Sequence, residues 1–372
     1  MTGNKPASGV AAIVLAAGMS RRMGTPKQLL CWNSKPLLEH ALENVRGSAV
    51  DEIVLVLGAA ADEIRRQVSM DGLTLVENPD YQQGMGTSLR SGVSALSSSA
   101  KAAFVVLADQ PFVRPATLDR MIASYSRSAP QVLIPLYRGF RGNPVLLDRS
   151  LFPELMNLAG DVGCRAVFGH HTQGIHRLPV DDPGILLDID SQHDWKALDS
   201  AGDPTSNVRQ LPDVEERQRV EGNRREIVIL GRDAVAHALS ALARVMNFTV
   251  TIVDPLLRLP DFPDADRVLH ALDFSRLVTG ECYVVVASRG QWDEEGVEAA
   301  LQSGAIYTGL LANRKRAEEI LNALRHRGMP EDKLSFLRAP AGLHIGAEGP
   351  QEIALSIMAE IVALQRRTPA KA

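Results

Sequence analysis

Cationic and very small side chains gather within a dozen positions near the start of the chain, in AAIVLAAGMSRRMGTPKQLL, residues 11–30. Arg21, Arg22 and Lys27 come within ten residues after the end of an aliphatic run. Small residues let the backbone approach a ligand and direct its amide groups at it. Guanidinium and ammonium groups form charge-assisted hydrogen bonds with phosphate. The stretch therefore predicts a phosphate-binding turn at the end of a buried strand.

The spacing excludes the P-loop, in which a lysine and then Ser or Thr follow the last glycine directly. Here Gly24 is followed by Thr25 and Pro26, and Lys27 comes only after them. The turn must therefore belong to another kind of phosphate site.

Carboxylates stand at the ends of two apolar runs. Asp109 ends AAFVVLAD, and Asp188 and Asp190 lie in LLDID. Open α/β sheets bind ligands at the carboxyl ends of their strands, and a carboxylate is costly there unless it holds a metal ion or an amide group. Mg²⁺ prefers carboxylate and phosphate oxygens, so Asp109 with one of the other two could bind it. Either of those two could instead cap a helix beginning near residue 193, and Asp109 could cap the turn before Pro111.

Short aliphatic runs alternate with helical patterns along most of the 372 residues, which is typical of βα units on a mostly parallel sheet. Residues 199–224 are polar and charged, so we expect a linker there. After it the βα pattern restarts with EIVILG. We therefore predict an α/β protein of two Rossmann-like domains, residues 1–198 and 225–372, the first on a mixed, mostly parallel sheet.

Composition narrows the class of protein. A hydrophobic share of 45% and a net charge of −4 indicate a soluble globular chain, with no reason to expect nucleic acid or an anionic membrane as partner. No apolar run approaches the roughly 20 residues that span a bilayer, and the first residues do not form a signal peptide. Three cysteines without a CxxC pair favour the reducing cytoplasm over a disulfide framework or zinc site.

The motif LAAGxSxRMGxxK, Leu15 to Lys27, resembles the signature loop of the nucleotidyltransferases that make molybdenum cofactor dinucleotides. The resemblance continues in order through about the first 190 residues, in NPDYQQGMGTSLRSGV, LADQPFV, RGNPVLL, LAGDVGCR and LLDIDSQHDW. The guanylyl branch usually reads LAGG with an Asp-Lys pair, which this sequence lacks. The first half is therefore most similar to the molybdenum cofactor cytidylyltransferases of the MobA-like family.

This resemblance implies Mg²⁺-dependent transfer of CMP from CTP to molybdenum cofactor, with release of pyrophosphate. Lys27, Arg22 and Asp109 would be catalytic, because joining two polyanions requires positioning and charge neutralisation. Mg²⁺ would bind to Asp109 together with Asp188 or Asp190. The nucleotide would contact Leu15, Ala16, Ala17, Gly18, Ser20, Arg21, Arg22, Gly24, Lys27, Gly84 and Ser88. The acceptor would lie against Gly142, Asn143, Pro144, Gly160 and Asp161. A GTP-dependent or sugar-phosphate transferase and a non-catalytic cofactor chaperone remain alternatives.

Residues 225–366 resemble the C-terminal Rossmann-like domain of the xanthine dehydrogenase accessory family, XdhC. The matching segments are YVVVASRGQWDEEGVEAAL, AIYTGLLANRKRAEEIL and LRAPAGLHIGAEGPQEIALSIMAEIVAL. The resemblance implies that this half binds the finished cofactor and delivers it to a molybdo-hydroxylase client. Both halves would then serve one pathway.

The ligand contact of this second half is expected away from its first turn. Asp233 stands where a dinucleotide-binding fingerprint has its second glycine, and a carboxylate there would meet the pyrophosphate. We expect the phosphate contact at the loop from Gly342 to Gly346 and at Pro350, where free amide groups meet the positive end of a helix. NAD binding at the first turn is the alternative. The apolar stripe of that helix, formed by Ile353, Ile357 and Ile361, is expected to pack in the core.

Overall fold

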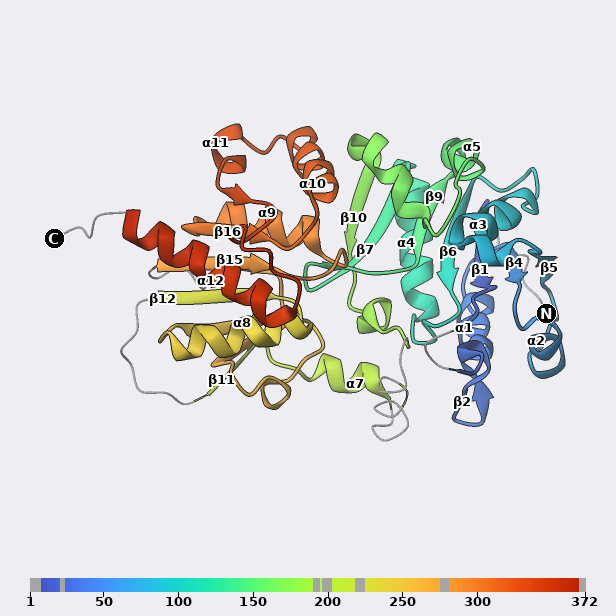
Figure 1. Cartoon of the computed structure of the whole chain (residues 1–372). Helices are drawn as coiled ribbons and strands as arrows, with labels where there is room; N and C mark the ends of the chain where they lie inside the picture. Colours follow the sequence, from blue (N-terminus) through green and yellow to red (C-terminus); the bar gives the residue numbers. More distant parts are fainter. Residues whose placement is uncertain are drawn as a thin grey trace. The chain divides into compact units, whose positions relative to one another are not determined.

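The structure is a computed structural model of the chain (Figure 1) and describes residues 8–20, 24–189, 195, 203–217, 225–274 and 281–367. The chain divides into two compact units, Met1–Tyr137 with Arg141–Arg209, and Arg138–Phe140 with Gln210–Ala372. Each unit contains one large, mostly parallel sheet, which confirms the predicted α/β class. Within the described parts of the chain, no helix is both long and apolar enough to cross a bilayer.

The first sheet has the strand order β10-β7-β9-β6-β1-β4-β5, with β8 beside β7. Only β9 runs antiparallel to its neighbours β6 and β7 on this path, so the sheet is mixed. Its strands are β1 Val10–Ala16, β4 Glu52–Leu57, β5 Thr74–Glu77, β6 Ala102–Leu107, β7 Val132–Tyr137, β8 Phe140–Arg141, β9 Val145–Asp148 and β10 Ile175–Pro179. A separate hairpin joins β2 Cys31–Trp32 to β3 Lys35–Pro36.

The central strands of this sheet are aliphatic runs buried on both faces, as parallel strands require. On one face, Ile13, Val54 and Val105 pack in a core cluster with Leu89 of helix α3. The described helices of this unit are α1 Leu37–Arg46, α2 Ala61–Gln67, α3 Met85–Ser94, α4 Pro115–Ser128, α5 Phe152–Leu155 and α7 Pro204–Arg209. The expected run AAFVVLAD forms β6, which ends at Leu107, whereas residues 186–189, the described part of LLDID, do not form a strand.

The second sheet has the order β11-β14-β13-β12-β15-β16-β17, and all its pairs are parallel except β11 with β14. Its strands are β11 Val214–Glu216, β12 Arg225–Leu230, β13 Thr249–Val253, β14 Arg267–Leu269, β15 Glu281–Val286, β16 Tyr307–Leu310 and β17 Leu337–Arg338. Its helices are α8 Ala234–Val245, α9 Asp293–Ser303, α10 Arg314–His326, α11 Glu331–Leu334 and α12 Pro350–Arg367.

Helices cover both faces of this second sheet, and Figure 1 shows α8 and α9 on opposite sides of it. On one side, Leu239 of α8 and Ile357 and Ile361 of α12 pack in one cluster with Ile229 of the central strand β12. Ile357 and Ile361 are fully buried. The apolar stripe of α12 is therefore core packing, as predicted.

Two elements lie within the stretch predicted to be a polar linker. Of residues 199–224 the structure describes 203–217, which contain helix α7 of the first unit and strand β11 of the second sheet. Val208 and Leu211 are buried. Residues 203–217 therefore contain a helix, a strand and buried apolar side chains, so this part of the stretch is not an extended tether.

Candidate functional site

A cavity of about 530 Å³ opens where β1 and β6 end in the first unit. Leu15 and Leu107, close to the carboxyl ends of these neighbouring strands, both line it. The remaining walls come from the turn after β1, from the 3₁₀ turns Lys27–Leu29 and Tyr81–Gln83, and from the start of α3. The cavity brings together these residues expected at the site: Leu15, Ala17, Gly18, Ser20, Lys27, Gly84, Ser88, Asp109 and Asp161.

An ion pair crosses this cavity. Lys27 Nζ donates a hydrogen bond to Asp109 Oδ2, and the two side chains are only 20% and 15% exposed. Asp109 is the second residue after β6, and the Ala108 amide between them donates to the Leu15 carbonyl (3.2 Å), which keeps the two strand ends in line. The Asp109 carboxylate thus already stabilises a positive charge at the floor of the cavity.

The turn after β1 is held by side-chain hydrogen bonds. Gln28 Nε2 donates to the carbonyl oxygens of Ala16 (3.2 Å) and Gly18 (3.0 Å). Ser20 Oγ donates to Gln28 Oε1 (3.2 Å) and accepts from the Lys27 amide (3.0 Å). Ser20 has a φ of +50°, which an L-residue adopts only when its surroundings hold it. These contacts fix both ends of the basic turn.

A second wall is built where two glycines meet. Gly84 has a φ of +114°, and a Cβ atom there would lie 2.3 Å from the backbone of Gly160. The Gly86 amide donates to the Gly160 carbonyl (3.1 Å). Only glycine allows this approach. The contact brings Gly160 and Asp161, expected on the acceptor side, next to the start of α3.

Ser88 is oriented by a buried asparagine. Asn78 is 2% exposed, and its Nδ2 donates to Thr87 Oγ1 (2.8 Å) and Ser88 Oγ (3.0 Å). Its Oδ1 accepts from the Asp80 amide (3.0 Å). The Ser88 hydroxyl that lines the cavity is therefore held by a residue outside the cavity wall.

The predicted metal ligands are only partly described. The Ile189 amide donates to the Asp109 carbonyl (3.1 Å), which brings the segment carrying Asp188 beside Asp109. Asp190 lies outside the described residues, as do Arg21 and Arg22. In the described parts of the chain, no three His, Cys, Asp or Glu side chains form a metal cage. The Asp109 carboxylate, which interacts with the Lys27 ammonium group, is a suitable ligand for Mg²⁺. This ion binds through one or two carboxylates together with phosphate oxygens.

The other predicted acceptor residues lie elsewhere. The Asn143 amide donates to the Ile185 carbonyl (3.0 Å), and a Cβ at Gly142 would lie 2.4 Å from the same oxygen. The loop that carries Pro144 is thus fastened to the 3₁₀ turn Pro183–Leu186. These three residues are absent from the described lining of the cavity.

The predicted phosphate loop of the second unit is closed by carboxylates. The Gly342 amide donates to Glu360 Oε2 (2.8 Å). The Glu348 and Gly349 amides, at the start of α12, both donate to Glu352 Oε2 (2.8 and 3.2 Å). Gly346 has a φ of +73° and open space around it. A phosphate at this loop would have to displace two carboxylates, so the geometry disfavours the predicted contact.

Asp233 has a structural partner at both of its oxygens. One accepts from the Ala236 amide (2.9 Å) and so caps α8, and the other accepts from Arg289 Nε (2.6 Å). At the end of β13, burial raises the pKa of the fully buried Asp254 carboxyl. The first turn of this unit thus directs a capping carboxylate at the place where a dinucleotide-binding turn presents glycine.

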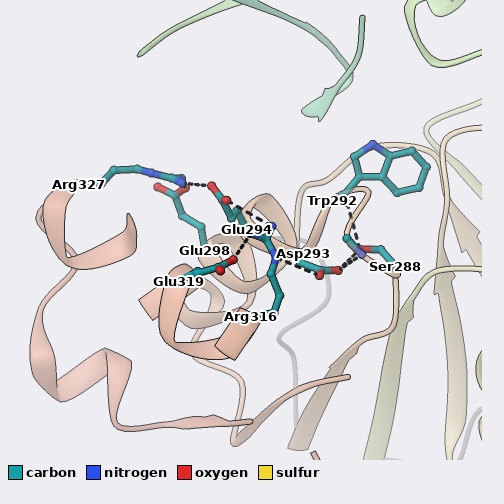
Figure 2. A network of polar contacts seen from close by, with 9 residues as sticks. Ser288, Trp292, Asp293, Glu294, Glu298, Arg316, Glu319 and Arg327 are labelled. Atoms are coloured by element: carbon teal, nitrogen blue, oxygen red, sulfur yellow. Dashed lines mark hydrogen bonds and ion pairs between the residues drawn. The ribbon is translucent and has the colours of Figure 1, made fainter. Parts of the chain in front are cut away.

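A polar network holds the segment after β15 (Figure 2). Ser288 Oγ donates to Asp293 Oδ1 (2.6 Å) and accepts from the Trp292 amide (3.1 Å). Arg327, which follows α10, forms ion pairs with two glutamates of α9. Its Nη2 lies 2.5 Å from Glu294 Oε2, and its Nη1 lies 2.5 Å from Glu298 Oε2. The contacts of Arg327 join α9 to the end of α10, and those of Ser288 join the loop after β15 to the start of α9.

Two family models match this chain, and together they span most of it. Residues 12–175 match the MobA-like NTP transferase domain, and residues 227–361 match the XdhC Rossmann domain. The chain joins a MobA-like NTP transferase domain to an XdhC Rossmann domain. The resemblances inferred from the motifs are thereby confirmed for both halves.

Curated relatives match the chain in part. The molybdenum cofactor cytidylyltransferase of Escherichia coli is 27% identical over 191 residues, 50% of this chain and 94% of that protein. The nicotine blue oxidoreductase of Paenarthrobacter nicotinovorans is 29% identical over 195 residues, 49% of this chain and 92% of that protein. The uncharacterized protein YqeB of Escherichia coli is 32% identical over 158 residues, 40% of this chain. The chain spans only 29% of the length of YqeB.

The transferase domain uses polar residues that the motif analysis did not select. Gln28 and Asn78 are both nearly fully buried, and each makes hydrogen bonds that hold a cavity-lining segment. The signal available in the sequence was position alone: Gln28 directly follows Lys27, and Asn78 directly follows a short strand. Their contacts are long-range, so periodicity could not indicate them.

Proposed function

We propose that the transferase domain moves CMP from CTP to molybdenum cofactor in a Mg²⁺-dependent reaction, with release of pyrophosphate. The observation that carries this proposal is the Lys27–Asp109 pair in a cavity at the carboxyl ends of two parallel strands. Such a cavity offers one group for the phosphates and one for the metal ion. The molybdenum cofactor cytidylyltransferase among the relatives supports the choice of nucleotide and acceptor.

The chemistry follows from the charges of the site. Lys27 supplies an ammonium group that offsets the negative charge of the triphosphate, and the turn from Ala16 to Ser20 offers backbone amides to it. Asp109, with Asp188 or Asp190, holds Mg²⁺, which supplies charge neutralisation at the transferred phosphate. Gly84 and Ser88, which also line the cavity, contact the nucleotide, and Asp161 contacts the acceptor. Most of the catalysis is then orientation of two anionic substrates.

The XdhC domain is proposed to receive the cytosine dinucleotide and deliver it to a hydroxylase of the xanthine dehydrogenase type. Fusion of the two domains in one chain supports this role, since maker and carrier of one cofactor would work in sequence. The three cysteines are free thiols, which is consistent with a protein that acts in the reducing cytoplasm. Because Glu352 and Glu360 hold the loop amides, a contact at the loop from Gly342 to Gly346 requires that these carboxylates move.

Pyrophosphate release tests the proposal. Full-length protein, Mg²⁺ and molybdenum cofactor should release pyrophosphate with CTP well above the rate with GTP or ATP. Asp109→Asn keeps the shape of the side chain but removes the charge, and should lower turnover by roughly 10² or more. Equal or faster pyrophosphate release with GTP would show that the protein is a guanylyltransferase. Release of pyrophosphate only when a sugar phosphate is present would show that the acceptor is a sugar phosphate and not molybdenum cofactor. Tight binding of the cofactor with no turnover would make the chain a carrier only.

A further inference from the structure

The side chain of Gln28 is buried in the wall of the cavity and fully used there. It is 2% exposed. Both donor positions of its amide nitrogen face backbone carbonyls, those of Ala16 and Gly18, and its oxygen accepts from the Ser20 hydroxyl. Ser20 Oγ in turn accepts from the Lys27 amide. One carboxamide thus connects the strand end, the turn and the residue that carries the ammonium group.

We propose that Gln28 is a positioning residue for the triphosphate: it sets the direction of the amide groups in the turn and the place of Lys27 relative to them. The inference rests on the proposed function, because it concerns the same site. It adds a residue for which neither the motif nor the comparisons supply a role.

The geometry of the peptide unit carries the argument. In a trans peptide the C=O and N–H groups point in opposite directions. Fixing the carbonyl of Ala16 on Gln28 therefore directs the amide of Ala17 away from Gln28. Ala17 lines the cavity. The orientation that a phosphate would need is thus prepared before it binds, which lowers the entropic cost of binding.

The chemistry of the carboxamide is also required, beyond its volume. Methionine has nearly the same length and shape but donates no hydrogen bond, so the buried Ala16 carbonyl and the more exposed Gly18 carbonyl would both lose their donor. Glutamate has the same shape but would present acceptors to those carbonyls. Both changes should release the turn while the core behind it stays filled.

The test is the affinity of full-length protein for CTP with Mg²⁺, measured by calorimetry on Gln28→Met and Gln28→Glu. We expect the dissociation constant to rise about tenfold or more, from the loss of two hydrogen bonds. Gln131→Met is the matched control, because Gln131 also uses its carboxamide in the same unit, toward His171 Nδ1 (3.2 Å), outside the cavity. It should leave CTP affinity unchanged.

The outcomes separate the two proposals. CTP affinity within twofold of the unchanged protein in Gln28→Met, or an equal loss in Gln131→Met, would overturn the positioning role alone. Binding of CTP that depends on Gln28, without pyrophosphate release on any acceptor, would support the positioning role and overturn the proposed transfer. Failure of the unchanged protein to bind any nucleoside triphosphate would overturn both.

Discussion

Replacing Lys27 by methionine should make the nucleotide-free protein bind divalent metal more tightly. In the structure Lys27 Nζ occupies Asp109 Oδ2, so a metal ion that uses this carboxylate must first displace the ammonium group. Once Lys27→Met removes the competitor, Asp109 is free to bind the ion. With triphosphate present the effect should reverse, because the ammonium group then interacts with phosphate.

The size of the effect follows from the burial of the pair. The side chains are 20% and 15% exposed, so solvent screens the pair less than an exposed one. A hydrogen bond between charged groups of this kind contributes about 1.5–3 kcal/mol. At about 1.4 kcal/mol for each factor of ten, the dissociation constant for metal should fall by about tenfold to a hundredfold.

The assay is a titration of nucleotide-free protein with Mn²⁺, followed by electron paramagnetic resonance. Lys35→Met is the control, since Lys35 forms a comparable pair with Glu43 (2.6 Å) that is about half exposed and outside the cavity. It should leave Mn²⁺ affinity unchanged. If Lys27→Met binds Mn²⁺ no more tightly than the unchanged protein, Lys27 does not compete with the metal ion for Asp109. Retained Mn²⁺ binding in Asp109→Asn would show that the metal uses other ligands.

Three further predictions concern the walls of the site, the XdhC domain and the thiols. Gly84→Ala should reduce CTP affinity and lower stability by about 1–3 kcal/mol, because its Cβ would overlap the backbone of Gly160; unchanged affinity would contradict this. Arg327→Met should lower the free energy of unfolding by about 1–3 kcal/mol in urea titrations, because Glu294 and Glu298 both lose this partner, whereas the exposed Arg325→Met should change little. Burial raises the pKa of Cys164 to about 11 and of Cys282 to about 12, so at pH 8 iodoacetamide should label the exposed Cys31 first; equally fast labelling of all three would show that the buried sites open readily.

Local sequence patterns were sufficient to predict the strands and the site residues that follow them. The aliphatic runs predicted the strands, and Asp109 was expected where β6 ends. The small and basic residues from Leu15 to Lys27 were expected at the end of β1, and the structure places its described part there. Such features depend on residues near one another in the chain. The hydrophobic periodicity of a segment and the end of an apolar run can both be seen in the amino-acid sequence.

The tertiary structure decided the remaining features, because each depends on residues far apart in sequence. The contact of Gly84 with Gly160 joins residues far apart in the chain, and no local pattern specifies it. The amides before α12 looked available in the sequence, but Glu352 folds back onto them. Residues 203–217 looked polar enough for a tether, yet Val208 and Leu211 are buried. A mostly polar stretch can fold when burial of a few apolar side chains offsets the conformational entropy lost on folding. Whether they are buried depends on tertiary packing.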